Sequence, residues 1–216
     1  MKYPLIVFDW DGTILDSAAA IVRAIQAASV DLDLPAPSDA QARHVIGLGL
    51  VDALQRAVPE LPAARYPEMV ARYRAHYLGG DHALSLFEGM RELLTGLQAR
   101  GHCLAVATGK SRLGLERALD HSGVRHRFTA SRCADECHSK PHPQMLLELM
   151  DELVFAPEET LMIGDTTHDL LMAREAGVAA LGVTYGAHTH GDLLAAGPLA
   201  CLHSVPELAG WLLQHA

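Results

Sequence analysis

Two aspartates at the end of an apolar segment are the residues of this chain best suited to do chemistry. Asp9 and Asp11 directly follow the branched, apolar residues 5–8 and are two positions apart. In an extended segment, residues i and i+2 point to the same side, so the two carboxylates face the same space. A buried pair of like charges is costly unless a cation lies between them or one carboxyl is protonated. The pair therefore indicates a metal site or an acid–base pair, although Asp-Gly-Thr at 11–13 is also ordinary turn and helix-cap chemistry.

Further polar residues lie where other apolar segments end. Thr108 and Asp165 each end such a segment, and Lys140 precedes the segment that ends in Asp165. In open α/β sheets, ligands bind at the carboxyl ends of the strands. We therefore expect these residues to meet Asp9 and Asp11 at one edge of a sheet.

The elements that must position these residues alternate along the chain. Apolar runs predict strands at 5–8, 102–108, 128–131, 160–164 and 179–184. Helical patterns fall between the runs, and a last helix is expected at 204–213. Strands that alternate with helices of this length predict a doubly wound α/β fold with a mostly parallel sheet.

One stretch interrupts this alternation. From about residue 16 to residue 80 the pattern is helical, and prolines and glycines divide it into short helices. The stretch directly follows the first strand, so it is expected to cover the carboxyl end of that strand. The predicted organisation is an α/β core formed by residues 1–15 and 82–216, with a helical cap at 16–81.

Composition excludes several classes of protein. The net charge of −9 in 216 residues argues against nucleic acid, because binding a phosphate backbone needs a concentrated basic surface. Four cysteines are too few for a disulfide scaffold and favour a reduced, cytoplasmic setting. No apolar run approaches the length of a membrane span, so no membrane partner is expected.

Four motifs in a fixed order resemble those of the haloacid dehalogenase (HAD) superfamily. The first is Phe-Asp-Trp-Asp-Gly-Thr at 8–13, and Thr108 at a strand end is similar to the second. Ser-Lys-Pro-His-Pro at 139–143 resembles the third, and Gly-Asp-Thr-Thr-His-Asp at 164–169 resembles the fourth. The insert stands where the phosphoglycolate-phosphatase-like branch carries a helical cap. The resemblance covers essentially the whole chain.

The resemblance implies a role for each motif residue. Asp9 is the expected nucleophile, which forms an acyl phosphate, and Asp11 the expected acid and base. Mg²⁺ is expected on the Asp9 carboxylate, the Asp11 backbone carbonyl and Asp165, with Asp169 behind these ligands as an orienting residue. The expected phosphate-binding residues are Gly12, Thr108, Gly109 and Lys140, and Lys140 also balances the charge of the nucleophile.

The family pattern also selects the chemistry. The dehalogenase branch has no aspartate at the position of Asp11, so phosphoryl transfer is expected. The phosphonate-cleaving branch needs a cap lysine, and the insert contains none. Gly109 departs from the pattern, since relatives often carry Asn there. The resemblance thus implies a phosphatase acting on a small phosphate ester comparable to phosphoglycolate.

Several residues outside the motifs carry weaker predictions. Gly109-Lys110-Ser111 lacks the earlier glycine of a nucleotide-binding P-loop, so Lys110 is expected to be a surface or rim cation and Ser111 a helix cap. Arg43 and His44, before a Gly-Leu-Gly loop, are the candidates to contact substrate from the cap. His188 and His190 are expected in an exposed loop after the last strand, with a place near the edge of the site as the alternative.

Three alternatives stay open at this stage. A phosphomutase would pass the acyl phosphate to a sugar hydroxyl, and exclusion of water by the cap would decide the outcome. A signalling receiver module also uses Asp, Thr or Ser, and Lys on an α/β sheet, but such modules lack the insert. The third is a non-catalytic binding module. The oligomeric state is left open.

Overall fold

A six-stranded parallel sheet forms the centre of the fold in the computed structural model, which describes residues 1–80 and 83–216. The strand order is β3-β2-β1-β4-β5-β6, and all five pairs of neighbours are parallel. The strands are β1 (Leu5–Phe8), β2 (Cys103–Thr108), β3 (Ala130–Cys133), β4 (Thr160–Gly164), β5 (Ala179–Val183) and β6 (Ala200–Leu202). The predicted doubly wound α/β fold is confirmed.

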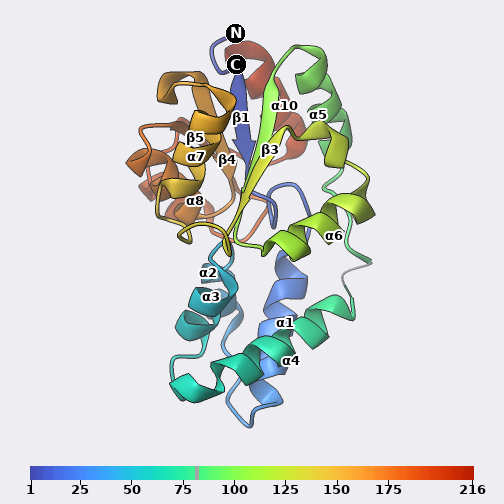
Figure 1. Cartoon of the computed structure of the whole chain (residues 1–216), viewed down its shortest axis with the longest axis vertical. Helices are drawn as coiled ribbons and strands as arrows, with labels where there is room; N and C mark the ends of the chain where they lie inside the picture. The colour runs from blue at the N-terminus through green and yellow to red at the C-terminus, as the bar shows by residue number, and fades with distance from the viewer. Residues whose placement is uncertain (81–82) are drawn as a thin grey trace.

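Helices cover both faces of this sheet (Figure 1). Ile6 and Phe8 of β1 belong to one hydrophobic cluster, which includes residues of α5, α6 and α10. Leu5 and Val7 belong to a second cluster with residues of α7 and α8. A strand whose alternate residues are buried on opposite faces lies inside the sheet, which explains its continuous apolar run. The core helices are α5 (Met90–Ala99), α6 (Arg112–Ser122), α7 (Gln144–Leu153), α8 (Thr167–Glu175), α9 (His190–Ala195) and α10 (Val205–His215).

The strand predictions differ from the structure at the two sheet edges. β3 begins two residues later than expected, because residues 125–127 form a short 3-10 turn and Phe128 packs on the core. β6 was not predicted at all, since a three-residue strand is too short to show a pattern. Ser111 and Ser204 cap α6 and α10, where they accept hydrogen bonds from the backbone N–H of Gly114 and Glu207.

Within the described residues, the insert forms four α-helices and a short 3-10 helix at Ala63–Arg65, and it has a hydrophobic cluster of its own. The α-helices are α1 (Ala18–Val30), α2 (Asp39–His44), α3 (Leu50–Ala57) and α4 (Tyr66–Leu78). Ile25, Leu54 and Met69 are fully or almost fully buried in this cluster. The four helices lie together at one end of the molecule, and both termini lie at the other (Figure 1).

The two chain connections between insert and sheet run side by side. Leu15 forms an antiparallel bridge with Leu86, and the backbone N–H of Asp16 donates to Ser85 O at 3.0 Å. The proposed division into core and cap places its second boundary between residues 81 and 82, outside the described residues. The division as a whole stays a proposal. In the described part of the chain, every helix is too short or too polar to cross a membrane.

Candidate active site

Asp9 stands at the carboxyl end of β1 and has no solvent exposure. Its Oδ1 accepts a hydrogen bond from Lys140 Nζ at 2.6 Å, while its Oδ2 has no hydrogen-bond partner among the described residues. Burial raises the pKa of Asp9 well above its usual value; Lys140 opposes this rise, and Asp169 and Asp165 add to it. A buried polar atom without a partner is unfavourable, so Oδ2 is the atom of this site with most to gain from a ligand.

Three buried carboxylates, those of Asp9, Asp165 and Asp169, lie close together in the site. Within the described residues, Asp9, Asp165 and Asp169 each offer an oxygen, and these oxygens lie within 4.8 Å of one another. Asp165 accepts from Thr13 Oγ1 at 2.8 Å and from Ala187 N at 2.7 Å. Burial, with a contribution from Asp169, raises the pKa of Asp165 to about 7. A cluster of hard oxygen donors with excess negative charge fits Mg²⁺.

Lys140 provides the positive charge inside this cluster. Its Nζ lies 2.6 Å from Asp9 Oδ1 and 2.7 Å from Asp169 Oδ1, and its side chain is fully buried. Burial alone lowers the pKa of Lys140, but Asp169 and Asp9 outweigh this effect and raise it, so the ammonium stays charged. Three carboxylates therefore face one buried ammonium, which leaves charge for a cation to balance.

Gly12 and Gly186 allow close approach to the Asp165 carboxylate. Gly12 has a φ of +81°, which a residue with a side chain rarely adopts. A Cβ atom at either glycine would collide with Asp165 Oδ2. The Asp-Gly-Thr turn is therefore more than a helix cap, because its glycine admits a carboxylate from the end of β4.

Thr108 is the last residue of β2, and Gly109 and Lys110 follow it in the loop. Thr108 is fully buried, and its Oγ1 accepts a hydrogen bond from Lys110 N at 3.2 Å. A Cβ atom on Gly109 would collide with the backbone carbonyl oxygens of Gly47 and Leu48. The departure from the family pattern at Gly109 thus has a physical reason: the backbone of the insert occupies the space that a side chain would need.

Of the two positions predicted for Lys110, the surface and the rim of the site, the structure shows the second. Its Nζ lies 3.0 Å from Asp11 Oδ1 and donates to Tyr77 Oη at 3.0 Å, and its side chain is 11% exposed. Ser17 Oγ donates to the same Asp11 oxygen at 2.6 Å. Asp11 is therefore held by Lys110 and Ser17, neither of which was predicted as a site residue.

The insert docks on the carboxyl edge of the sheet through α2 and the loop at 45–49, among other contacts. Gly49 N donates to Ser139 Oγ at 2.7 Å, next to Lys140. Arg43 Nη1 donates to Gly186 O at 3.3 Å, beside Asp165. Arg43 and His44, the predicted substrate contacts, are thus placed at the junction of insert and core. A substrate role for either stays a proposal.

Three histidines pack together at this junction. The His44 carbonyl accepts from His168 Nε2 at 2.9 Å and from His188 Nε2 at 3.2 Å. His188 Nδ1 accepts from Thr167 N at 3.1 Å, which places its proton on Nε2. Burial lowers the pKa of both residues, that of His168 to about 4, so both rings are neutral near pH 7. The prediction that His188 is exposed is wrong, because the ring is buried here.

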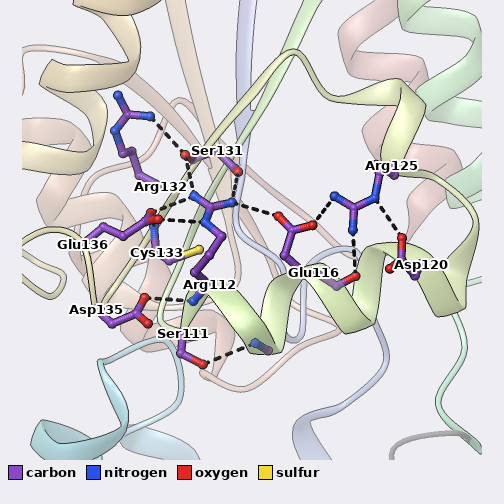
Figure 2. A network of polar contacts seen from close by, with 11 residues as sticks. Ser111, Arg112, Glu116, Asp120, Arg125, Ser131, Arg132, Cys133, Asp135 and Glu136 are labelled. Carbon is purple, nitrogen blue, oxygen red and sulfur yellow. Dashed lines mark hydrogen bonds and ion pairs between the residues drawn. The ribbon is translucent and has the colours of Figure 1, made fainter.

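An ion-pair network joins the start of α6, which follows Lys110 in the chain, to β3 and the loop that follows it (Figure 2). Arg112, the first residue of α6, binds Glu136 with two contacts of 2.8 and 2.7 Å and donates to Ser131 Oγ at 2.6 Å. Ala134 N donates to Lys110 O at 3.0 Å, which joins the loop after β3 directly to the loop after β2. Bidentate Arg–carboxylate pairs add geometric precision, so this network stabilises the relative position of the loops.

The sequence signal for the residues that were missed was weak. Ser17 lies just beyond the first motif, and its hydroxyl reads as a helix cap until Asp11 is seen beside it. Thr13 reads as turn chemistry until its bond to Asp165, 152 positions away, is seen. Tyr77 lies on an insert helix, whose orientation the sequence does not determine.

Comparison with known proteins gives consistent results. Residues 6–183 match the family described as haloacid dehalogenase-like hydrolase. The chain is 39% identical to a protein of Dickeya dadantii named "Probable phosphatase IndB", with 96% of this chain and 92% of that protein covered. It is 35% identical to a 5'-nucleotidase of Pseudomonas aeruginosa, with coverage of 96% and 97%. A crystal structure of a predicted phosphoglycolate phosphatase from Haemophilus somnus has a TM-score of 0.86 at 27% identity, with coverage of 99% and 98%.

Proposed function

The chain belongs to the haloacid dehalogenase-like hydrolase family and is a phosphatase, and on that premise we propose a Mg²⁺-dependent reaction through a phosphoaspartate at Asp9. The observation that carries the proposal is the buried Asp9 Oδ2, which has no hydrogen-bond partner among the described residues. Its neighbour Oδ1 is fixed by Lys140. One oxygen is thus held in place, and the other is available to attack phosphorus.

In the proposed reaction, Asp11 donates a proton in the first chemical step and accepts one in the second. Asp9 Oδ2 bonds to phosphorus, the bond from phosphorus to the ester oxygen breaks, and Asp11 gives a proton to the leaving alkoxide. Asp11 then takes a proton from water as the water oxygen attacks phosphorus and the bond to Asp9 breaks. The contacts of Asp11 with Ser17 and Lys110 fix the position of its carboxyl group.

The remaining site residues stabilise charge. The Asp9 carboxylate, the Asp11 backbone carbonyl and the Asp165 carboxylate would hold Mg²⁺, which when bound supplies positive charge to the transferring group. Lys140 balances the charge of Asp9, and Asp169 orients Lys140 through their 2.7 Å contact. Thr108, with the backbone N–H of Gly109, would bind phosphate oxygens. The backbone N–H of Gly12, also expected to bind phosphate, instead donates to Leu15 O at 2.8 Å.

The substrate that we propose is a small phosphomonoester comparable to phosphoglycolate. The close docking of the loop at 45–49 on Gly109 and Ser139 supports a small substrate, because it limits the space over the site. A nucleoside monophosphate is a second candidate, favoured by the identity with a relative named 5'-nucleotidase. A phosphomutase would use the same first step.

A panel of phosphate esters assayed with and without Mg²⁺ tests the proposal. Phosphate release that requires both Mg²⁺ and Asp9 is the expected result. Metal-independent turnover, or full activity in Asp9→Asn, would overturn the mechanism. Isomerised sugar phosphate without net release of phosphate would identify a mutase, and preferred turnover of nucleoside monophosphates would identify the second candidate.

A further inference from the structure

We propose that Lys110, together with Tyr77 and Tyr73 of α4, binds a carboxylate carried by the leaving group of the substrate. This inference rests on the proposed function and assigns the residue that recognises the substrate's second anionic group. Lys110 lies on the loop after β2 of the core, and the two tyrosines lie on α4 of the insert. Neither the motifs nor the predicted cap contacts, Arg43 and His44, include these residues.

The geometry brings the three side chains to one point. Lys110 Nζ contacts Asp11 Oδ1 and Tyr77 Oη, each at 3.0 Å. The rings of Tyr73 and Tyr77 are stacked, with centroids 5.8 Å apart and planes inclined by 12°. Burial raises the pKa of Tyr73; Lys110 opposes this rise, and Tyr77 and Asp11 add to it, so the phenol lies in the field of both site charges.

The position of Asp11 determines which part of the substrate meets Lys110. Asp11 gives its proton to the ester oxygen, so the group bonded to that oxygen lies beside the Asp11 carboxyl. In phosphoglycolate, one methylene separates the ester oxygen from the carboxylate. A carboxylate at that distance falls within reach of an ammonium that itself contacts Asp11.

The donors of Lys110 suit this task. An ammonium group has three N–H donors, and the contacts with Asp11 and Tyr77 use two of them in the described part of the chain. Burial lowers the pKa of Lys110, but Asp11, Tyr77 and Tyr73 outweigh it, so the charge persists. Arg43, the cap residue chosen from sequence, already donates to Gly186 O.

Two esters that differ in one charge test this inference. Phosphoglycolate and 2-hydroxyethyl phosphate share a two-carbon skeleton, and only the first carries a carboxylate. We expect wild type to prefer phosphoglycolate in kcat/KM, and Lys110→Met to reduce that preference about 10- to 100-fold, the value of a hydrogen bond to a charged group. Lys110→Arg should retain part of the preference. Lys2→Met, which removes a lysine stacked on Tyr3 at the amino terminus, is the matched control.

A second variant and a binding measurement keep the test independent of stability. Tyr77→Phe removes a single hydroxyl and should lower the same preference by a smaller factor. Calorimetry with Mg²⁺ should show tighter binding of 3-phosphonopropionate than of propylphosphonate to wild type, and a smaller difference in Lys110→Met.

The inference fails if the ratio of the two esters is unchanged in Lys110→Met, even when both activities fall together. It also fails if wild type shows no preference between the two esters or between the two phosphonates. Failure of the proposed function is a separate outcome, seen as phosphate release that does not depend on Asp9.

Discussion

The two lysines of the site differ in where their partners come from. Lys140 contacts Asp9 and Asp169, and all three residues belong to the α/β core, with Asp169 in the first turn of α8. Lys110 contacts Asp11 in the core and Tyr77 in the insert. Carboxylates raise the pKa of both lysines against the effect of burial, so both are lasting positive charges.

This difference separates two tasks. The contacts of Lys140 are complete without the insert, so they suit the step that every phosphate ester undergoes. The contacts of Lys110 depend on how α4 lies over the core, so they suit the choice of ester. The residues that we assign to phosphoryl transfer thus lie at one edge of the sheet. The residues that we assign to the choice of ester lie where the insert meets that edge.

We expect the largest loss of activity when the nucleophile in the core is replaced. Asp9→Asn keeps the size of the side chain and removes the nucleophile, so kcat should fall on the order of 10⁴-fold or more for every ester. Steady-state phosphate release measures this, with circular dichroism to verify folding. A folded variant that keeps more than a tenth of the wild-type rate would contradict the assignment.

Lys140→Met should reduce both activity and stability. It leaves Asp9 and Asp169 buried without their cation, which costs about 3–5 kcal/mol of unfolding free energy. Activity should fall about 10²–10³-fold, the usual effect of losing one stabilising charge. Urea unfolding of the metal-free protein measures the stability. An unchanged midpoint of urea unfolding would mean that Lys140 does not neutralise charged carboxylates of Asp9 and Asp169 in the folded protein.

Gly109→Ala tests the docking of the insert. A Cβ atom at this position collides with the Gly47 and Leu48 carbonyl oxygens, so the insert cannot close fully. We expect kcat/KM to fall on the order of 10²-fold with little change in the thermal midpoint, because misplacement of a site group is costly to rate. Gly96→Ala in α5, where a Cβ atom meets open space, is the matched control. Equal activities of the two variants would show that the close approach is not needed.

The histidine junction should show a smaller, pH-dependent effect. The pKa of His168 is lowered from 6.5 to about 4, so the unfolded chain binds the extra proton first and stability is lost as pH falls below 6.5. Near pH 5 the loss should reach about 2 kcal/mol relative to pH 7.5. The raised pKa of Asp165 acts with the opposite sign, so the contribution is measured as the difference between wild type and His168→Gln in urea unfolding without metal. A difference that does not vary with pH would exclude this contribution.

The sequence predicted the site residues of the core better than the contacts between core and insert. Asp9, Thr108, Lys140 and Asp165 follow recognisable strands or stand in motifs, and parallel strands bring their carboxyl ends to one edge. The contacts of Lys110 were not predicted, because they depend on Tyr77, which lies on a helix whose orientation no local pattern specifies. His188 was predicted to be exposed because its burial depends on His44 of the insert and Thr167 of α8, which no local pattern brings beside it.

The most direct test of the central claim is to trap the phosphoaspartate. Wild-type enzyme is quenched during turnover with borohydride, which reduces an acyl phosphate to an alcohol, and the peptides are analysed by mass spectrometry. The account predicts homoserine at position 9 in wild type and none there when the substrate is omitted. Turnover with unmodified Asp9 throughout, or reduction at a different carboxylate, would contradict it.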